Sequence, residues 1–199
     1  MLAEDNDPGL GSLENFPTVL HARAAFESEV NVANLQKSMV SALRALSDLR
    51  LPIELSRSDH EGYVNGQLDF KVGVGNVEAF DIFDDREEDR LLRRIENKGA
   101  FDSLDLSFKL HYAINDGKKH TIPDDRFLTR LLFRPGRMEV YVHHHKGIRR
   151  VQPEELIGLL IEEVDMNLES KKYPRLLPEE NSQVSRRNWA QIISGKTSL

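Results

Sequence analysis

The sequence predicts an α+β domain in which three helices pack on one face of a mainly antiparallel sheet of about five to six strands. Apolar and polar residues alternate in several separate stretches, which is the period of a strand with one buried side. Three other stretches repeat apolar residues at helical spacing. The elements follow the order β-α-β-β-α-β-β-β-α. Because each predicted strand has one polar side, we expect the second face of the sheet to be open to solvent, a ligand or a partner.

The strands are predicted from alternation. It is strictest between Leu104 and Ile114, where every second residue is apolar. A strand over 16–28 competes with a helix, because this stretch is rich in alanine. Residues 134–137, Arg-Pro-Gly-Arg, indicate a hairpin turn, and because a two-residue turn beginning with proline fits the twist of paired strands poorly, a longer loop is favoured. The other strands are expected over 53–57, 63–75, 127–133 and 138–145.

The helices are predicted from apolar stripes and from their end signals. Asn31 is a suitable N-cap for the first helix, and Pro52 ends it, since proline disfavours helical backbone at the preceding residue. The second helix opens on an acidic turn and closes at Gly99, and the third opens at Pro153. The three helices are expected over 32–50, 84–98 and 153–168.

The chain of 199 residues is expected to form one domain with two tails. Residues 1–15 have little apolar content and predict a flexible N-terminal arm. The domain is expected over 16–170, and residues 171–199 are expected to wrap around it as a C-terminal tail. A candidate anchor in this tail consists of Trp189, Ile192 and Ile193.

The composition excludes several classes of site. There is no cysteine, so disulfides, thiolate metal sites, iron–sulfur clusters and cysteine nucleophiles are excluded. The longest apolar runs are too short to span a bilayer, and the N-terminus is acidic where a signal peptide would be basic and then apolar. We therefore expect a cytoplasmic protein that does not contact a membrane.

Charge is distributed unevenly along the chain. Residues 126–150 contain six Arg and one Lys against the single Glu139, a local net charge of +6. Residues 78–89 contain seven carboxylates against Arg86, a local net charge of −6, and the whole chain carries −6. The two patches could meet within one fold or across a symmetric homodimer. The acidic total disfavours nucleic acid as a partner.

The basic hairpin over 126–150 is the preferred candidate site. Arginine can bind a phosphate with two parallel hydrogen bonds, and tyrosine can stack on a base. We therefore expect a non-catalytic binding or assembly protein that contacts an anionic ligand or a protein partner through this hairpin and the open sheet face. RNA binding is an alternative, because the same residues suit phosphates. The candidate ligand-binding residues are Arg130, Arg134, Arg137, Tyr141, Arg149 and Arg150.

A metal-dependent hydrolase is the alternative from a different class. Alternation directs His111, His143 and His145 to the polar side of the sheet and His144 to the apolar side. Three outward imidazoles could hold Zn²⁺ or another divalent ion if the strand order brings them together. No other cofactor is expected, because the glycine-rich loops and nucleophile motifs of common enzyme families are missing from the sequence.

Overall fold

The computed structural model describes residues 9–56, 63–114 and 122–184. These residues form an α+β fold with three helices and a mixed, mostly antiparallel open sheet, so the predicted fold class is confirmed. The elements are β1 (Ser12–Leu13), β2 (Ala22–Glu27), α1 (Val32–Ser47), β3 (Arg50–Ser56), β4 (Tyr63–Val77), β5 (Ala79–Ile82), α2 (Asp85–Lys98), β6 (Ser103–Ile114), β7 (Asp125–Arg134), β8 (Arg137–Lys146), α3 (Pro153–Ser170) and β9 (Leu177–Pro178).

The predicted order of elements is confirmed, with three short strands added to it. Without β1, β5 and β9 the order is β-α-β-β-α-β-β-β-α, as expected. The added strands bring the described sheet to nine strands, above the five to six predicted. They contain two to four residues each, which is too short for alternation to reveal.

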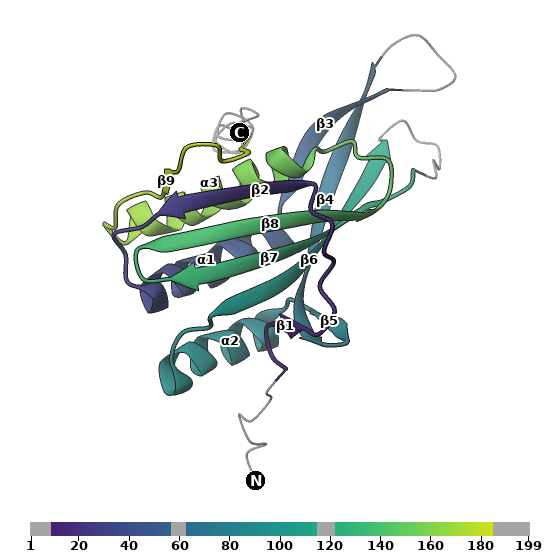
Figure 1. Ribbon diagram of the computed structural model, residues 1–199. Helices are drawn as coiled ribbons and strands as arrows, with labels where there is room; N and C mark the ends of the chain where they lie inside the picture. The colour runs from purple at the N-terminus through teal and green to yellow at the C-terminus, as the bar shows by residue number, and fades with distance from the viewer. Residues whose placement is uncertain (1–8, 57–62, 115–121, 185–199) are drawn as a thin grey trace.

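The sheet is built around its longest strands. The path through it is β1-β4-β6-β7-β8-β2-β9, and β3 and β5 also pair with β4. β1 pairs with β4 in parallel, and the other pairings among the described strands are antiparallel. β4 pairs with β6 as far as Val72 and then with the short strands β1 and β5 (Figure 1).

The three helices cover one face of the sheet, as Figure 1 shows. Asn31 caps α1 as predicted, and its side chain accepts a hydrogen bond from the Asn34 amide at 2.9 Å. The helix ends at Ser47, before the predicted stop, and Pro52 lies inside β3. Proline is tolerated there because, among the described strands, β3 pairs with β4 alone and has a free edge. The apolar stripe of α1 is completely buried at Met39 and Leu43.

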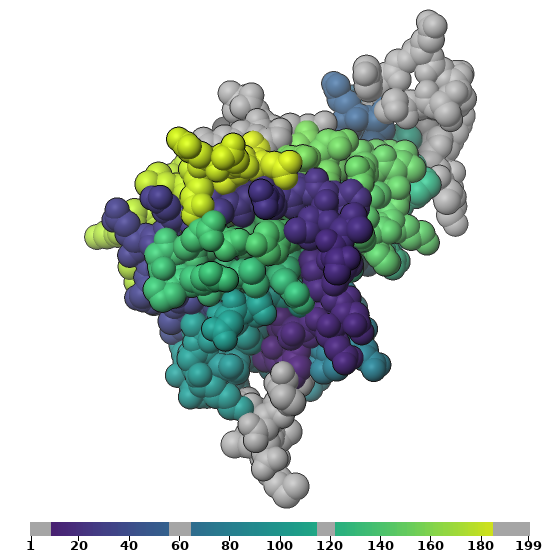
Figure 2. Space-filling model, viewed as in Figure 1, coloured from purple at the N-terminus to yellow at the C-terminus, as the bar shows by residue number. Residues whose placement is uncertain are grey.

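A segment before β2 crosses the other face of the sheet, and we call residues 9–21 the strap. The predicted flexible arm included residues 9–15, but β1 pairs with β4 in this part of the chain. The Leu13 amide donates to Asp105 at 2.8 Å, and Arg130 binds the same carboxylate with two hydrogen bonds of 2.7 Å. The Arg130 guanidinium also lies 4.5 Å from the centre of the Phe16 ring. Figure 2 shows the strap in purple over the strands.

The described part of the C-terminal tail lies along β2. β9 pairs with the end of β2, and the side chains of Ser182 and Gln183 accept hydrogen bonds from the amides of Ala25 and Arg23. The predicted anchor at Trp189, Ile192 and Ile193 lies outside the described residues. Within the described chain, no helix has the length and apolar character that a membrane crossing requires.

Candidate functional site

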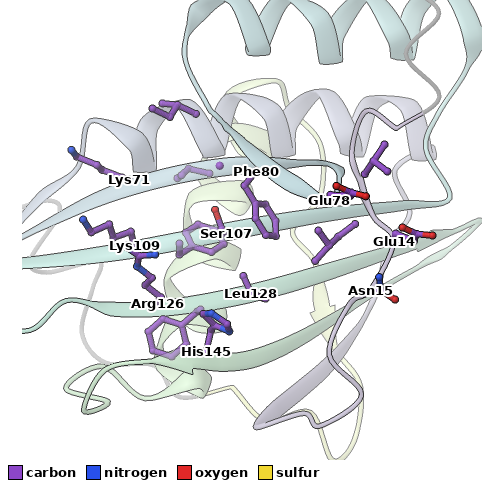
Figure 3. A pocket seen from close by; sticks show the side chains of 17 residues that line it. Glu14, Asn15, Lys71, Glu78, Phe80, Ser107, Lys109, Arg126, Leu128 and His145 are labelled. Atoms are coloured by element: carbon purple, nitrogen blue, oxygen red, sulfur yellow. The ribbon is translucent and has the colours of Figure 1, made fainter.

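A groove of about 710 Å³ lies on the sheet face that the helices leave open (Figure 3). Its floor is formed by β4, β6 and β7, and it is also lined by residues 13–15 of the strap, by Val77 and Glu78 of the β4–β5 turn and by Phe80 of β5. This volume is within the usual range for small-molecule sites. The groove is therefore large enough to hold a small ligand on the open face.

Four cations lie side by side across the floor and its edge, and we call them the cation row. The strand register pairs Lys71 with Lys109, Lys109 with Arg126, and Arg126 with Lys146. Lys71, Lys109 and Arg126 line the groove, and Lys146 follows them on β8. Neighbouring strands are about 4.8 Å apart, and like charges directly opposite each other destabilise a sheet. The row therefore costs stability unless an anion neutralises it.

One carboxylate reaches the cation row. Asp124 accepts from Lys109 at 2.8 Å and from His111 at 2.8 Å. Burial raises the pKa of Asp124, but the hydrogen bonds from Lys109 and His111 outweigh it and lower this pKa overall. Elsewhere in the described chain, no carboxylate forms an ion pair with Lys71, Arg126 or Lys146. This end of the groove thus keeps an excess of positive charge.

A β-bulge determines which residues of β8 face the groove. Arg126 pairs with Lys146 and Phe127 pairs with His144, so His145 is an extra residue with no partner of its own. Bulges of this kind redirect side chains and are common beside functional sites. Simple alternation would direct Lys146 to the core side, whereas the bulge places it opposite Arg126. His145 lines the groove next to it.

The middle of the groove is apolar. Figure 3 shows Phe80, Ser107 and Leu128 between the cations at one end and Glu14, Asn15 and Glu78 at the other. Gly73 makes room for this arrangement, because a Cβ atom there would lie 2.5 Å from the Ser107 hydroxyl and 3.1 Å from the Phe80 Cβ. The groove can therefore hold an apolar body between two polar ends.

The rim of the groove contains a strained residue. Val77 is the first residue of a two-residue turn between β4 and β5, and its φ is 54°. This left-handed region is unfavourable for a β-branched residue, and such outliers are concentrated at functional sites. The Val77 side chain is 43% exposed and lines the groove.

Three of the predicted ligand-binding residues form contacts within the protein. Arg130 is bound to Asp105, as described above. Arg137 pairs with Glu179 and with Glu139, and the Tyr141 hydroxyl donates to Glu139. These ion pairs involve carboxylates outside 78–89, whereas Arg126 of the basic hairpin and Glu78 of the acidic patch line the same groove.

The other three predicted residues lie near the ends of the hairpin. Arg134 is exposed at its turn. The backbone amides of Arg149 and Arg150 donate to the buried Asp125 carboxylate, and the Arg150 guanidinium lies 5.0 Å from the centre of the Tyr112 ring. The six predicted residues do not line the groove, and a ligand at these six stays a prediction.

Of the three predicted metal ligands, His143 and His145 lie close together on β8, with ring centres 6.1 Å apart, and His111 lies on β6. His111 is bonded to Asp124, the Nδ1 atom of His143 lies 2.7 Å from the Val19 carbonyl oxygen, and His145 lies in the bulge. Across residues 9–56, 63–114 and 122–184, no group of three or more His, Asp or Glu side chains is arranged to hold a metal ion. His144 faces inward as expected, with its ring 5.0 Å from that of Phe127.

The basic hairpin was predicted from the sequence, but half of the cation row was not. Lys71 and Lys109 are outward residues of predicted strands, and alternation alone places them on the open face. Their position beside Arg126 depends on the register between β4, β6 and β7, which pairs segments far apart in sequence. The carboxylates at the other end of the groove were not predicted as part of a site, because Glu14 lies in the stretch that was expected to form the flexible N-terminal arm.

Comparisons with known proteins found no relative. No protein-family model matches the chain, and no curated protein sequence or solved structure is detectably similar to it.

Proposed function

We propose that this protein is a non-catalytic binding protein and that its groove takes an anionic ligand with an apolar body. The observation that carries the proposal is the cation row: Lys71, Lys109 and Arg126 line one cavity, and within the described chain only Lys109 of these three has an ion-pair carboxylate, Asp124. An anion bound there would relieve the repulsion within the row. The apolar residues beyond the row favour a ligand that is more than a simple ion.

The expected affinity of such a site is modest. Lys71 and Arg126 are exposed, and an exposed ion pair contributes about 0.2 to 1 kcal/mol. Two or three such contacts, together with burial of an apolar group against Phe80 and Leu128, favour binding in about the micromolar to millimolar range. The site would therefore bind reversibly.

The residues that line the groove favour binding over catalysis. Ser107 is the one hydroxyl residue among the described residues that line it, and in the described structure Ser107 and His145 do not hydrogen-bond to each other. A nucleophile needs a base within hydrogen-bond reach, although such bonds are often looser without substrate. The predicted protein partner, homodimer, RNA complex and metal-dependent hydrolase stay predictions.

The proposal is tested with 4-phenylbutyrate, which carries one carboxylate and one apolar ring. Titration followed by amide NMR shifts should perturb residues 71–73, 107–109 and 126–128 together. The double variant Lys71→Gln with Arg126→Gln should weaken binding about fivefold to tenfold, because two charge contacts are lost. Arg93→Gln is the matched control, since this exposed arginine lies on α2 and does not line the groove.

Two further measurements make the test decisive. The neutral analogue 4-phenylbutyramide should bind much more weakly than the acid, because it carries no charge for the cation row. Arg134→Gln tests the turn of the hairpin as the alternative anion site. The proposal is overturned if Arg134→Gln weakens binding more than the double groove variant, or if the acid and the amide bind equally.

A further inference from the structure

The end of the groove opposite the cation row is acidic. Glu14 and Glu78 both line it, and Figure 3 shows them on the same side. The two segments are held together because the Glu14 amide donates to the Val77 carbonyl at 2.8 Å. Within the described part of the chain, neither carboxylate has an ion-pair partner. The groove therefore carries an excess of negative charge at this end.

The two ends are separated by a definite length of strand. Lys109 and Asp105 are four residues apart on β6, and Asp105 holds the Leu13 amide, next to Glu14. A strand rises by about 3.3 Å per residue, so the cationic and acidic ends are about 13 Å apart. A small anion bound at the row cannot reach the acidic end. Phe80 and Leu128 lie between the two ends (Figure 3).

We infer that the ligand is a short peptide bound in extended form, with its terminal carboxylate on the cation row and its terminal ammonium group at Glu14 and Glu78. This inference rests on the proposed function. An extended peptide advances about 3.4 Å per residue, so about four residues span the distance between the ends. Apolar side chains in the middle of the peptide would contact Phe80 and Leu128.

The arrangement of charge favours this ligand over others that suit the cation row. A nucleic acid carries phosphates along its whole length, and Glu14 and Glu78 would repel those at the acidic end. A fatty acid has a single charged group and would leave both carboxylates without a partner. A peptide with free termini carries a negative charge at one end and a positive charge at the other, which matches the cationic and acidic ends of the groove.

The experiment uses three forms of one tetrapeptide, Ala-Phe-Leu-Ala, with the full-length protein and isothermal titration calorimetry. The free peptide carries both terminal charges, the N-acetylated form lacks the ammonium group, and the C-amidated form lacks the carboxylate. Each capped form should bind about fivefold more weakly than the free peptide, because one charged contact is lost. The three forms share the same side chains, so the comparison isolates the termini.

Variants assign the two ends to residues. Glu14→Gln with Glu78→Gln should weaken binding of the free peptide about fivefold and leave the N-acetylated peptide unchanged within about twofold. Asp89→Asn on α2 is the control for loss of an exposed carboxylate outside the groove. Unchanged affinity for the N-acetylated peptide also reports that the double variant is folded and that its cation row is intact.

The possible failures are distinguishable. If the N-acetylated and free peptides bind equally while the C-amidated form is weaker, the peptide inference is overturned and the proposed anion site stands. If the C-amidated and free peptides bind equally, the peptide inference is overturned, and the proposed function fails as well when 4-phenylbutyrate does not bind in the groove. If 4-phenylbutyrate binds in the groove and none of the three peptides binds, the inference is overturned.

Discussion

Replacing Arg130 with methionine tests whether this residue holds the strap or binds a ligand. Its guanidinium donates to both oxygens of Asp105 at 2.7 Å and to the Leu13 carbonyl at 3.2 Å. Asp105 is completely buried, whereas 29% of the Arg130 side chain is exposed. The hydrogen bonds and nearby carboxylate also raise the pKa of Arg130, although burial opposes this effect. The sequence predicted a ligand contact at Arg130, but these contacts indicate a structural role.

The expected loss of stability follows from the buried carboxylate. Removing one partner of a buried ion pair costs about 3 to 5 kcal/mol, because the other charge remains buried without compensation. Partial exposure of Arg130 lets water reach the vacated space, and the Leu13 amide still donates to Asp105, so the lower end applies. Loss of the contact with the Phe16 ring adds about 0.5 to 1 kcal/mol. We expect Arg130→Met to cost about 3 to 4 kcal/mol.

The assay is urea unfolding followed by far-ultraviolet circular dichroism. With a slope of about 2 to 3 kcal/mol per molar urea, the midpoint should fall by about 1.5 M. Adding Asp105→Asn to Arg130→Met should recover at least half of the loss, because the buried charge is gone. Arg93→Met, the exposed control on α2, should change stability by less than about 0.5 kcal/mol. A cost below about 1 kcal/mol for Arg130→Met would refute a structural role for this ion pair.

Two other predictions concern a buried acid and the strained turn. Burial, and then the neighbouring Glu162, raise the pKa of Glu163 from 4.5 to about 7, so its ionisation opposes folding increasingly as pH rises through this window. The free energy of unfolding of Glu163→Gln should therefore equal that of the parent protein near pH 4.5 and exceed it by up to about 3 kcal/mol near pH 8. The same difference in free energy at both pH values would contradict this explanation. Val77→Asn should stabilise the protein by about 0.5 to 1 kcal/mol in urea unfolding, because asparagine tolerates positive φ, and a loss of stability would show that Val77 packing outweighs its strain.

Long periodic segments made the fold predictable from the sequence. In β6, each second residue from Leu104 to Leu110 is buried, as the alternation predicted. The polar side of such a strand was harder to interpret, since Asp105 lies on it and is buried beneath the strap. The two-residue strand β1, which fixes the strap, has no periodic signal. Short pairings of this kind depend on the assembled sheet rather than on local sequence.

The site was less predictable because it depends on contacts between distant segments. Arg130 and Arg137 looked available in the sequence, but Arg130 pairs with a carboxylate 25 residues away, and Arg137 pairs with one 42 residues away in addition to the nearby Glu139. The cation row depends on strand register, and its last member depends on the bulge at His145. Local charge density therefore located the basic hairpin, which includes Arg126, but not Lys71 and Lys109, which line the same cavity.

The buried Asp105 links the strap to the division of charge within the groove. By binding Arg130, it neutralises the hairpin cation that lies beneath the strap. By accepting from the Leu13 amide, it also fixes the start of the strap, and so brings Glu14 to the acidic end. Arg126 lies four residues before Arg130 on β7, beyond the reach of this carboxylate, and remains in the cation row. One buried ion pair thus accounts for the separation of the two charged ends on which the peptide inference depends.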